Sequence, residues 1–415
     1  MRVAPVSQSD NGIRVCAASA RISTKEGTAQ YLFDAAEGGE KDKKLIKKVF
    51  LSGHRSLLEH TVATFAFTDV PVTVEQFLIE HRLCSFTVKS RRYVNYTDTG
   101  FYIPEGLSDE KKAQYTAHMQ RLFSAYTRLV ELGVPMEDAR FVLPYCFLSN
   151  FYATANVREW LAIARDMTVG RGQLLQELRD AAQPICAYLE EHFPGALDLT
   201  PCGQCRPVQP SCEAVGASHA EQGHAGVLCA SAYRPEMDEK AVVADSRPRE
   251  LEMMQYVLHA ENVSLAAVTH FARHRMQSPL FPDSASVLVR NAHILPESIK
   301  ANPEALAVYE DAFAENEKAA KAMLSENCLR FYALAGNTCD FDFAMNAREL
   351  LHFMQLRTCN RAQWEIRSLA WEMLRELRER DPKLFCEYGP SCYVTGKCPE
   401  GRLSCGKPYR KEEAL

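Results

Sequence analysis

Arginine, histidine and serine side chains gather in this chain at spacings that suit recognition of a phosphate or another planar anion. Arg82, Ser90, Arg91, Arg92 and Tyr93 fall within one short stretch. Together they supply guanidinium forks, a hydroxyl and an aromatic ring. For any one of these arginines, a solvent-exposed ion pair is the commoner explanation. An anion-binding role therefore needs support from a wider pattern.

An internal repeat provides that pattern. Arg140, Asn156, Arg158, Arg171 and Gln173 return as Arg330, Asn346, Arg348, Arg361 and Gln363, each 190 positions further on. Upstream, Glu80-His81-Arg82 with Ser85 matches Arg273-His274-Arg275 with Ser278 at an offset of 193. Constant offsets over polar residues predict a duplicated unit, and the differences between the copies then point to function.

Composition and charge limit the classes of protein that remain. The 415 residues are 47% hydrophobic and 24% charged, which is ordinary for globular domains. With 48 basic and 53 acidic residues the formal net charge is −5, so neither nucleic acid nor an anionic membrane is expected as a partner. No apolar run reaches membrane-spanning length and the first residues lack a signal-peptide pattern, which predicts a cytoplasmic protein.

The elements that must position these residues follow the repeat. The predicted divisions are a first unit over 1–198, a linker rich in Cys, Gly and Pro over 199–240, and a second unit with a cysteine-containing tail over 241–415. Ser108 or Asp109 is expected to cap a helix with apolar residues at helical spacing. Asn302 and Pro303 predict the start of the same helix in the second unit.

The repeated Asn, Arg and Gln residues are predicted to lie on long helices over 156–189 and 346–377. Residues 61–68 alternate like a strand, and 101–104 and 293–296 resemble matching strand ends. The predicted fold is α+β, with two tandem helix-rich units that each contain a small antiparallel sheet. No helix-opening GxGxxG and no GxxxxGK[ST] motif occurs, so neither a Rossmann site nor a P-loop is expected.

The fifteen cysteines are expected to be free thiols, because their number is odd and no export signal precedes them. One trio follows each unit: Cys202, Cys205 and Cys212, then Cys392, Cys398 and Cys405. Either trio could bind structural zinc with a fourth ligand from His219, His224, Cys229 or Cys386. The paired CxxC signal of a zinc ribbon is absent, so thiols without a metal are the preferred interpretation and no metal site is predicted.

Several stretches together resemble the flavin-dependent thymidylate synthases. They are Gly53-His54-Arg55-Ser56-Leu57-Leu58-Glu59-His60, residues 80–93, and Asp138-Ala139-Arg140-Phe141-Val142-Leu143-Pro144. Residues 80–93 are similar to the family signature, which reads RHR, seven residues and then Ser. Residues 346–353, Leu356-Arg357 and residues 361–367 resemble the family's C-terminal region. The resemblance leaves out the linker and the start of the second unit, where no GHxSxxEH counterpart is evident.

The resemblance implies reductive methylation of dUMP to dTMP. Methylenetetrahydrofolate would supply the methylene group, and NADPH would reduce a bound FAD that delivers hydride. The implied dUMP ligands are Ser90, Arg92, Arg140, His270, Arg273, Arg330 and Arg357, with Arg357 as the catalytic residue that activates uracil. The implied FAD ligands are Ser56, Glu59, His81, Arg82, Arg273, His274, Arg275, Asn346, Arg348 and His352. A bidentate arginine against uracil favours ionisation at N3, which raises the nucleophilicity of C5.

The two copies depart from the family pattern in complementary ways. The first has Glu80 in place of the first Arg of RHR and Met167 in place of the activating Arg. The second has Asp283 in place of the signature Ser, and Ala285 and Ser286 in place of Arg and Tyr. One composite dUMP site is expected to survive, built from Arg273 and Arg357 with Ser90, Arg92 and Arg140. The chain is thus predicted to be a fused pseudo-dimer, and two chains to form a homodimer.

Two alternatives stay open. Thr87 and Val88 replace the usual Asn-Glu of the signature, and with Glu80 they favour a same-fold flavoprotein that acts on another pyrimidine nucleotide. A catalytically silent nucleotide- or flavin-binding regulator is the other alternative, and it would bind ligand without turnover. A nucleotide competition panel and a turnover assay would separate the three functions.

Overall fold

The computed structural model describes residues 1–200, 215–216, 223–282 and 284–409. These residues form two compact units that are interleaved along the chain. Unit 1 lies within the bounds 1–124, 144–211 and 325–332, and unit 2 lies within 125–143, 212–324 and 333–415. Each unit therefore takes one short segment from the other half of the sequence. The divisions predicted at 198 and 241 describe the sequence repeat and stay a prediction. The two compact units have other boundaries, because each is made of interleaved segments.

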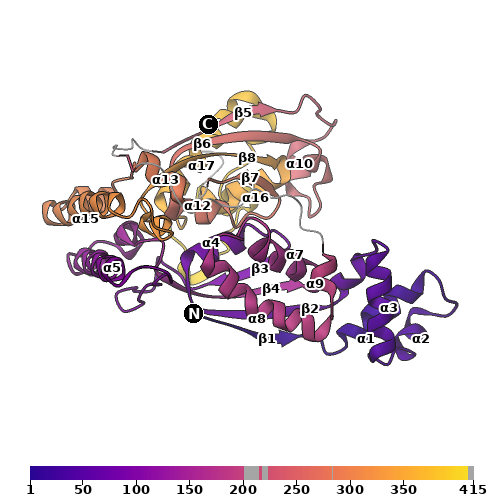
Figure 1. Ribbon diagram of the computed structural model, residues 1–415. Coiled ribbons are helices and arrows are strands. Elements are labelled where there is room, and N and C mark those ends of the chain that lie inside the picture. The colour runs from indigo at the N-terminus through magenta and orange to yellow at the C-terminus, as the bar shows by residue number, and fades with distance from the viewer. Residues whose placement is uncertain (201–214, 217–222, 283, 410–415) are drawn as a thin grey trace. The chain divides into compact units, whose positions relative to one another are not determined.

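Unit 1 is built around an antiparallel sheet with the strand order β1-β2-β4-β3 (Figure 1). The strands are β1 (Arg2–Gln8), β2 (Val62–Pro71), β3 (Cys84–Val88) and β4 (Leu148–Asn156). Strand β2 confirms the alternation predicted over 61–68, because Ala63, Phe65 and Phe67 are buried in turn. The ring of Phe65 packs edge-on against Trp160, with centroids 4.7 Å apart.

Helices α4, α7 and α8 contact this sheet, and α8 runs beside β1 (Figure 1). The helices are α1 (Gly12–Ile22), α2 (Ala29–Asp34), α3 (Glu40–Leu51), η1 (Ser56–His60), α4 (Val72–Ile79), α5 (Asp109–Glu131), α7 (Val157–Thr168), α8 (Gln176–His192), α9 (Ala196–Leu199) and η3 (Leu329–Tyr332). Helix α5 confirms the predicted helix, and the Ser108 hydroxyl accepts a hydrogen bond from the Lys111 amide at 3.3 Å. It begins in unit 1 and ends in unit 2.

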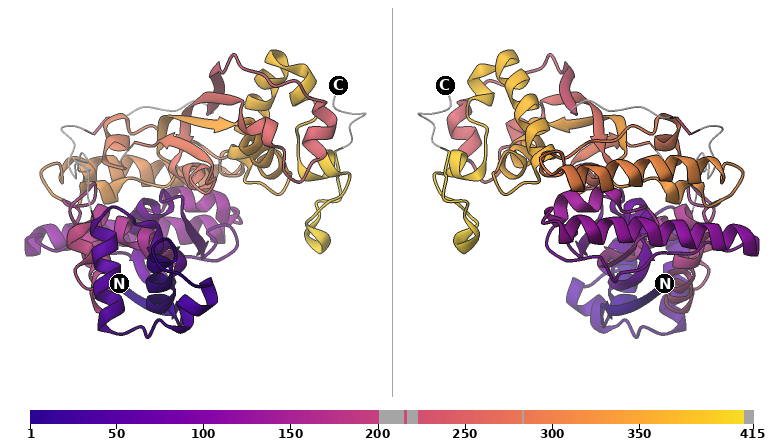
Figure 2. Two further views of the ribbon diagram at one scale, coloured as in Figure 1. Left: turned by 90° about the vertical axis from the view of Figure 1, so that its right-hand side faces the viewer. Right: turned by 90° about the vertical axis from the view of Figure 1, so that its left-hand side faces the viewer.

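Unit 2 repeats the plan with the strand order β5-β6-β8-β7. Its strands are β5 (His224–Ala230), β6 (Gln255–Ser264), β7 (Gln277–Leu280) and β8 (Thr338–Asn346). Its helices are α6 (Met136–Ala139), η2 (Arg140–Val142), α10 (Glu239–Ala244), α11 (Arg249–Glu252), α12 (Leu265–Phe271), α13 (Ser284–Arg290), α14 (Glu297–Lys300), α15 (Pro303–Lys321), α16 (Ala347–Arg357), α17 (Trp364–Arg380), α18 (Pro382–Phe385), α19 (Ser391–Thr395) and η4 (Gly401–Leu403). Helix α15, the long orange helix of Figure 2, is capped by Asn302 as predicted. The α+β fold with a small antiparallel sheet in each unit is confirmed.

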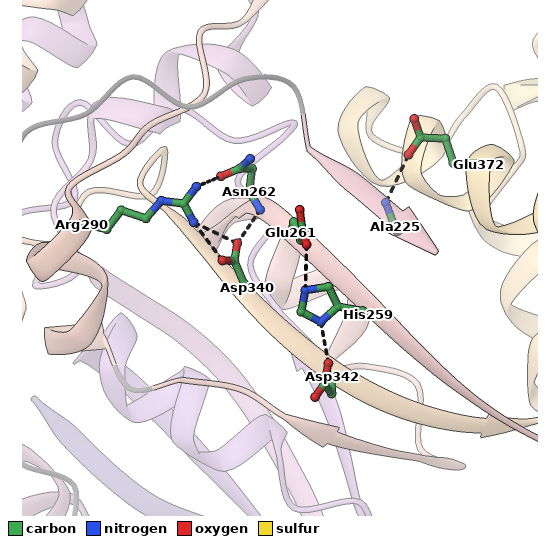
Figure 3. A network of polar contacts seen from close by, with 8 residues as sticks. All are labelled: Ala225, His259, Glu261, Asn262, Arg290, Asp340, Asp342 and Glu372. Carbon is green, nitrogen blue, oxygen red and sulfur yellow. Dashed lines mark hydrogen bonds and ion pairs between the residues drawn. The ribbon is translucent and has the colours of Figure 1, made fainter. Parts of the chain in front are cut away.

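The same irregularity interrupts the second strand of both sheets. Strand β2 bulges at Asp69 with φ 51°, and β6 bulges at Asn262 with φ 53°. The Asp69 amide donates to Asn150 Oδ1 at 3.2 Å, whereas the Asn262 amide donates to Asp340 Oδ1 at 2.7 Å (Figure 3). Asp and Asn thus exchange places across the strands, and both tolerate a positive φ. The duplication extends to the backbone.

The surrounding contacts in unit 2 are charged. Figure 3 shows Arg290 bonded to Asp340 and Asn262, and His259 between Glu261 and Asp342. His259 Nδ1 lies 2.5 Å from Asp342 Oδ1. These side chains are partly exposed and link β6 to β8, so they belong to the sheet surface and contain none of the predicted site residues.

The prediction of single long helices over 156–189 and 346–377 is wrong. Each stretch forms two helices, α7 with α8 and α16 with α17. Arg158 and Arg348 lie on the first helix of each pair, and the intervening loops hold Arg171, Gln173, Arg361 and Gln363. Gly172 permits the first break, since a Cβ there would lie 2.8 Å from Leu178 Cδ1. In unit 2, Gln363 Oε1 accepts from the Ile366 amide at 3.1 Å and caps α17. The apolar periodicity continues across each break, and for that reason it suggested one helix.

The strand ends predicted at 101–104 and 293–296 form single bridges and not strands. Phe101 bridges to Phe147 and His293 bridges to Asn337. The following Pro104 and Pro296 have no amide to extend the ladder.

Candidate functional site

The predicted site residues divide between the two units. Unit 2 holds Arg140, His270, Arg273, His274, Arg275, Asn346, Arg348, His352 and Arg357. Unit 1 holds Ser56, Glu59, His81, Arg82, Ser90, Arg92 and Arg330. Arg140 and Arg330 have crossed over, since each belongs to the unit built mainly from the other half of the sequence. The unit with Arg273 and Arg357 therefore also contains Arg140.

A linked set of side chains holds Arg357 at the end of α16. His274, in the turn after α12, places Nδ1 2.9 Å from Glu349 Oε1. Arg357 Nε donates to His274 Nε2 at 3.0 Å, and Arg357 Nη2 donates to the His270 carbonyl at 3.2 Å. Glu349 lies in the first turn of α16, where its amide donates to the capping Asn346 Oδ1 at 2.8 Å. One helix therefore carries both ends of the set.

The electrostatics of this set keep His274 neutral. Its side chain is 2% exposed, and burial lowers the pKa of His274 well below its usual value, with the charge of Arg357 acting in the same direction. Burial also raises the pKa of Glu349, although His352 and Arg348 oppose that shift. The contacts of Arg357 with His274 and His270 are therefore made to neutral acceptors.

In unit 1 the corresponding histidine, His81, lies between two carboxylates. Nδ1 is 3.6 Å from Glu159 Oε1 and Nε2 is 3.5 Å from Asp166 Oδ2. Burial alone would lower the pKa of His81, but Asp166 and Glu159 raise it above its usual value. Met167 occupies the position that corresponds to Arg357 and is fully buried. The pKa of the corresponding imidazole is thus raised in unit 1 and lowered in unit 2.

Glu80 is also held within unit 1. Arg171 Nη1 lies 2.8 Å from Glu80 Oε2, and Nη2 lies 2.9 Å from Asp166 Oδ2. Burial would raise the pKa of Asp166, but His81 and Arg171 lower it to about 2. Carboxylates therefore neutralise the basic residues on this side of unit 1.

Arg330 forms a buried ion pair with Glu177 in unit 1. Arg330 Nε is 2.8 Å from Glu177 Oε1, and Nη2 contacts the other carboxylate oxygen. Their side chains are 4% and 0% exposed. The position that corresponds to Glu177 in unit 2 is Arg367, so this acid has no equivalent beside Arg140.

Arg140 lies near two carboxyl groups whose pKa values are raised by burial, those of Asp138 and Glu365 in unit 2. Its Nε donates to the Glu137 carbonyl at 3.0 Å, and its charge reaches Glu365. Burial raises the pKa of Glu365 to about 7, while bonds from Ser264 and the charge of Arg140 oppose the shift. Glu365 is thus partly protonated near neutral pH, so it offsets less of the positive charge of Arg140 than a fully ionised carboxylate would.

The predicted flavin ligands of unit 2 form an exposed donor set. Arg273, Arg275, Arg348 and His352 are exposed around the start of α16 and the turn after α12. Guanidinium and imidazole donors suit the pyrophosphate and polar ring edges of FAD, so the exposed residues fit that cofactor. His274 is buried between Glu349 and Arg357, which points to a different task.

The structure reveals a counterpart of Glu59 in the second copy of the repeat, which the sequence analysis did not find. Arg348 pairs with Glu252 of α11, as Arg158 pairs with Glu59 of η1. Glu252 stands 193 positions after Glu59, which is the upstream offset of the repeat. The match was not evident because the second copy lacks the Gly and His residues of the GHxSxxEH motif. The offset of 193 residues could have revealed it.

The cysteines of the tail share one pocket. Cys359, Cys392, Cys398 and Cys405 line it together with Arg361. Cys202, Cys205, Cys212 and His219 lie outside the described residues, as does Asp283. Within the described part of the chain, no group of three or more His, Cys, Asp or Glu side chains is arranged to hold a metal ion. None of the described helices is long and apolar enough to cross a membrane.

A larger pocket lies away from the predicted site. It has a volume of about 200 Å³ and lies in unit 1, among α1, α3, α8 and α9. Apolar side chains such as Phe50, Leu58 and Phe193 line it, with Lys43, Lys44 and Lys47 also contributing. It contains none of the residues predicted to bind nucleotide or flavin.

Comparison with known proteins defines the class. A family model described as "Thymidylate synthase complementing protein" matches residues 6–195 and 232–383. The chain therefore belongs to this family, that of the flavin-dependent thymidylate synthases, and the resemblance found in the sequence is confirmed.

The following relatives and solved structure each match less than half of the chain. The flavin-dependent thymidylate synthase of Geobacter sulfurreducens is 37% identical over 164 residues, which cover 38% of this chain and 70% of the relative. That of Clostridium tetani is 35% identical over 178 residues, covering 38% and 71%. A crystal structure of thymidylate synthase X from Helicobacter pylori with FAD and dUMP is 20% identical, with a TM-score of 0.38, and covers 48% of this chain and 99% of that chain.

Proposed function

We propose that this chain catalyses reductive methylation of dUMP to dTMP, with methylenetetrahydrofolate and NADPH as co-substrates and FAD as cofactor. Membership of the thymidylate synthase family supports the reaction class. The observation that carries the assignment is Arg357, whose guanidinium is held in place by His274 Nε2 and by the His270 carbonyl. Met167 rules out the same role at the corresponding position of unit 1.

In the proposed mechanism Arg357 binds the uracil ring. Its guanidinium favours ionisation of the ring at N3, and the negative charge that develops raises the nucleophilicity of C5. Burial of His274 and Glu349 excludes water from behind the guanidinium, so the donor needs no reorganisation when charge develops. Bound FAD would supply hydride chemistry, and Arg273, Arg275, Arg348, Asn346 and His352 are proposed to hold it.

The remaining nucleotide ligands are proposed from the family pattern. Arg140 and Arg273 would bind the dUMP phosphate or sugar, and Ser90 and Arg92 are proposed as further phosphate ligands. Arg140 comes from the first half of the sequence but belongs to unit 2, which supports a site that needs both halves of the chain. We further propose a cytoplasmic homodimer, since the family model matches two segments of the chain, 6–195 and 232–383, as expected for a fused pair of copies.

The test is mass-spectrometric detection of dTMP after incubation of the purified chain with dUMP, methylenetetrahydrofolate, NADPH and FAD. The proposal expects dTMP, and a sample without NADPH serves as the control. If NADPH is oxidised and no dTMP forms, a panel of other pyrimidine nucleotides will show whether the acceptor is different. If neither reaction occurs while FAD or dUMP binds, the chain is a silent binding protein and the proposal is wrong.

A further inference from the structure

We propose that Glu349, acting through His274, positions Arg357 for uracil activation. This inference rests on the proposed function, and it makes Glu349 and His274 positioning residues that do not themselves touch the substrate. Its basis is the continuous chain of contacts from Glu349 Oε1 to His274 Nδ1 and from His274 Nε2 to Arg357 Nε.

The directions of the two hydrogen bonds determine where the His274 proton lies. A guanidinium can only donate, so His274 Nε2 must accept from Arg357 Nε. A neutral imidazole with an accepting Nε2 carries its proton on Nδ1, and Nδ1 faces the Glu349 carboxylate at 2.9 Å. The carboxylate therefore selects the one tautomer that can hold Arg357.

Packing fixes this arrangement from both ends. The His274 ring packs on Phe353 with centroids 4.7 Å apart, and Glu349 is 8% exposed beside the Asn346 cap. The His270 carbonyl gives Arg357 a second anchor at Nη2. Two anchors define the plane of a guanidinium, and catalysis by a planar donor depends on that plane.

In unit 1 a different residue type faces Nε2 of the corresponding histidine. Glu159 takes the place of Glu349 at 3.6 Å from His81, but Asp166 approaches Nε2 from the side that Arg357 uses in unit 2. An acid there requires a proton on Nε2, so the tautomer preference is lost. Glu159 therefore provides a matched control for Glu349 on the same scaffold.

The experiment compares Glu349→Gln with Glu159→Gln in the full chain. A Gln side chain can donate to Nδ1, so the proton can move to Nε2, where it would oppose the Arg357 N–H group. We expect kcat to fall about 10- to 100-fold in Glu349→Gln with a smaller change in the KM for dUMP, because a misplaced catalytic group costs rate. Glu159→Gln should leave kcat within about twofold.

The second readout is the nitrogen NMR spectrum of histidine-labelled protein, which reports the tautomer directly. Wild type should show His274 protonated on Nδ1, and Glu349→Gln should show a gain of the Nε2-protonated form. An unchanged tautomer or an unchanged kcat in Glu349→Gln would overturn the proposal. Glu349→Asp, which keeps the carboxylate, should retain the tautomer and recover part of the rate. Glu349→Ala, which also removes the carboxylate, replaces Glu349→Gln if that variant does not fold.

The NMR readout does not depend on turnover. If wild type makes no dTMP but His274 shows the Nδ1 tautomer that Glu349→Gln alters, only the proposed function fails. If dTMP forms and the tautomer is insensitive to Glu349, only the positioning role fails.

Discussion

The two units place a histidine at the same point of the same fold, with two carboxylates beside it in unit 1 and a carboxylate and an arginine beside it in unit 2. His81 lies between Glu159 and Asp166, whereas His274 lies between Glu349 and Arg357. The helices, caps and bulges around these residues match, so the scaffold has kept its packing while two neighbouring positions reversed the charge. Asp166-Met167 and Leu356-Arg357 are those positions.

A second difference between the units also places more negative charge beside a basic residue in unit 1. Unit 1 gives Arg330 the buried acid Glu177, whereas unit 2 has Arg367 at the matching position and Arg140 near the weakly acidic Glu365. An anion such as a nucleotide phosphate would compete with Glu177 in unit 1. The comparison predicts that Arg330 binds such an anion more weakly than Arg140 does, although both arginines are kept.

The largest effect is expected from breaking the neutralised pair. Arg330→Ala should lower the free energy of unfolding by about 3–5 kcal/mol, because it leaves the Glu177 carboxylate buried without its counter-ion. Urea denaturation measures this change. Arg330→Met combined with Glu177→Leu should recover most of the loss, whereas the exposed pair of Arg290 with Asp340 provides a control in which Arg290→Ala costs about 0–1 kcal/mol. Similar losses in both arginine variants would contradict the structural role of the buried pair.

Replacement of the activating arginine should abolish most turnover and spare the fold. Arg357→Ala is expected to lower kcat for dTMP formation about 10²- to 10³-fold, as removal of one charge-stabilising donor does, while FAD stays bound. Rates are measured by dTMP production and FAD by its absorbance. Met167→Leu is the matched control in unit 1, since it keeps the volume of a buried side chain and should leave kcat within about twofold. Unchanged turnover in Arg357→Ala would show that the site lies elsewhere.

The two histidines should give opposite pH dependences. The raised pKa of His81 contributes stability that is present below its unfolded pKa of about 6.5 and is lost as the pH rises through the folded value. The lowered pKa of His274 contributes stability that is present above about 6.5 and is lost as the pH falls. Urea midpoints should therefore show that His81→Gln costs more at about pH 5.5 than at about pH 8, and that His274→Gln costs more at about pH 8. Slopes of the same sign would show that the two imidazoles share one charge state.

The smallest effects should come from the matched surface pairs. Arg158→Ala and Arg348→Ala each remove a half-exposed ion pair, so each should change the free energy of unfolding by less than about 1 kcal/mol. A flavin fluorescence titration should separate them, because only Arg348 is proposed to bind FAD. Equal losses of FAD affinity would indicate that unit 1 also holds flavin at this position.

Much of the fold could be predicted from local patterns. Asn302 and Ser108 carry the capping chemistry that starts α15 and α5, and the alternation around Phe65 and Phe67 identified β2. The break between α16 and α17 could not be predicted, because the apolar face continues in phase on both sides of it. Gln363 caps α17 only once the chain has turned, which is a tertiary event.

The candidate site was predictable as a set of arginines and histidines but not as a set of acids. Glu349 and Glu159 keep the 190-residue offset, yet a Glu in the first helical turn is ordinary capping chemistry and gives no sign of a histidine contact. Glu177 pairs with a residue 153 positions away, and no local pattern reports such a distance. The FAD and dUMP assignments beyond the family itself stay predictions.

The exchanged segments also set an order on synthesis of the chain. Ribosomes release the N-terminal residues first, so residues 125–143 are available before the rest of unit 2 exists, but unit 1 lacks residues 325–332 until most of the chain has been made. Until then Glu177 has no counter-ion, and the burial of its carboxylate is opposed by desolvation. Most of unit 1 is therefore translated first, but unit 1 can complete its fold only after residues 325–332 have been synthesised.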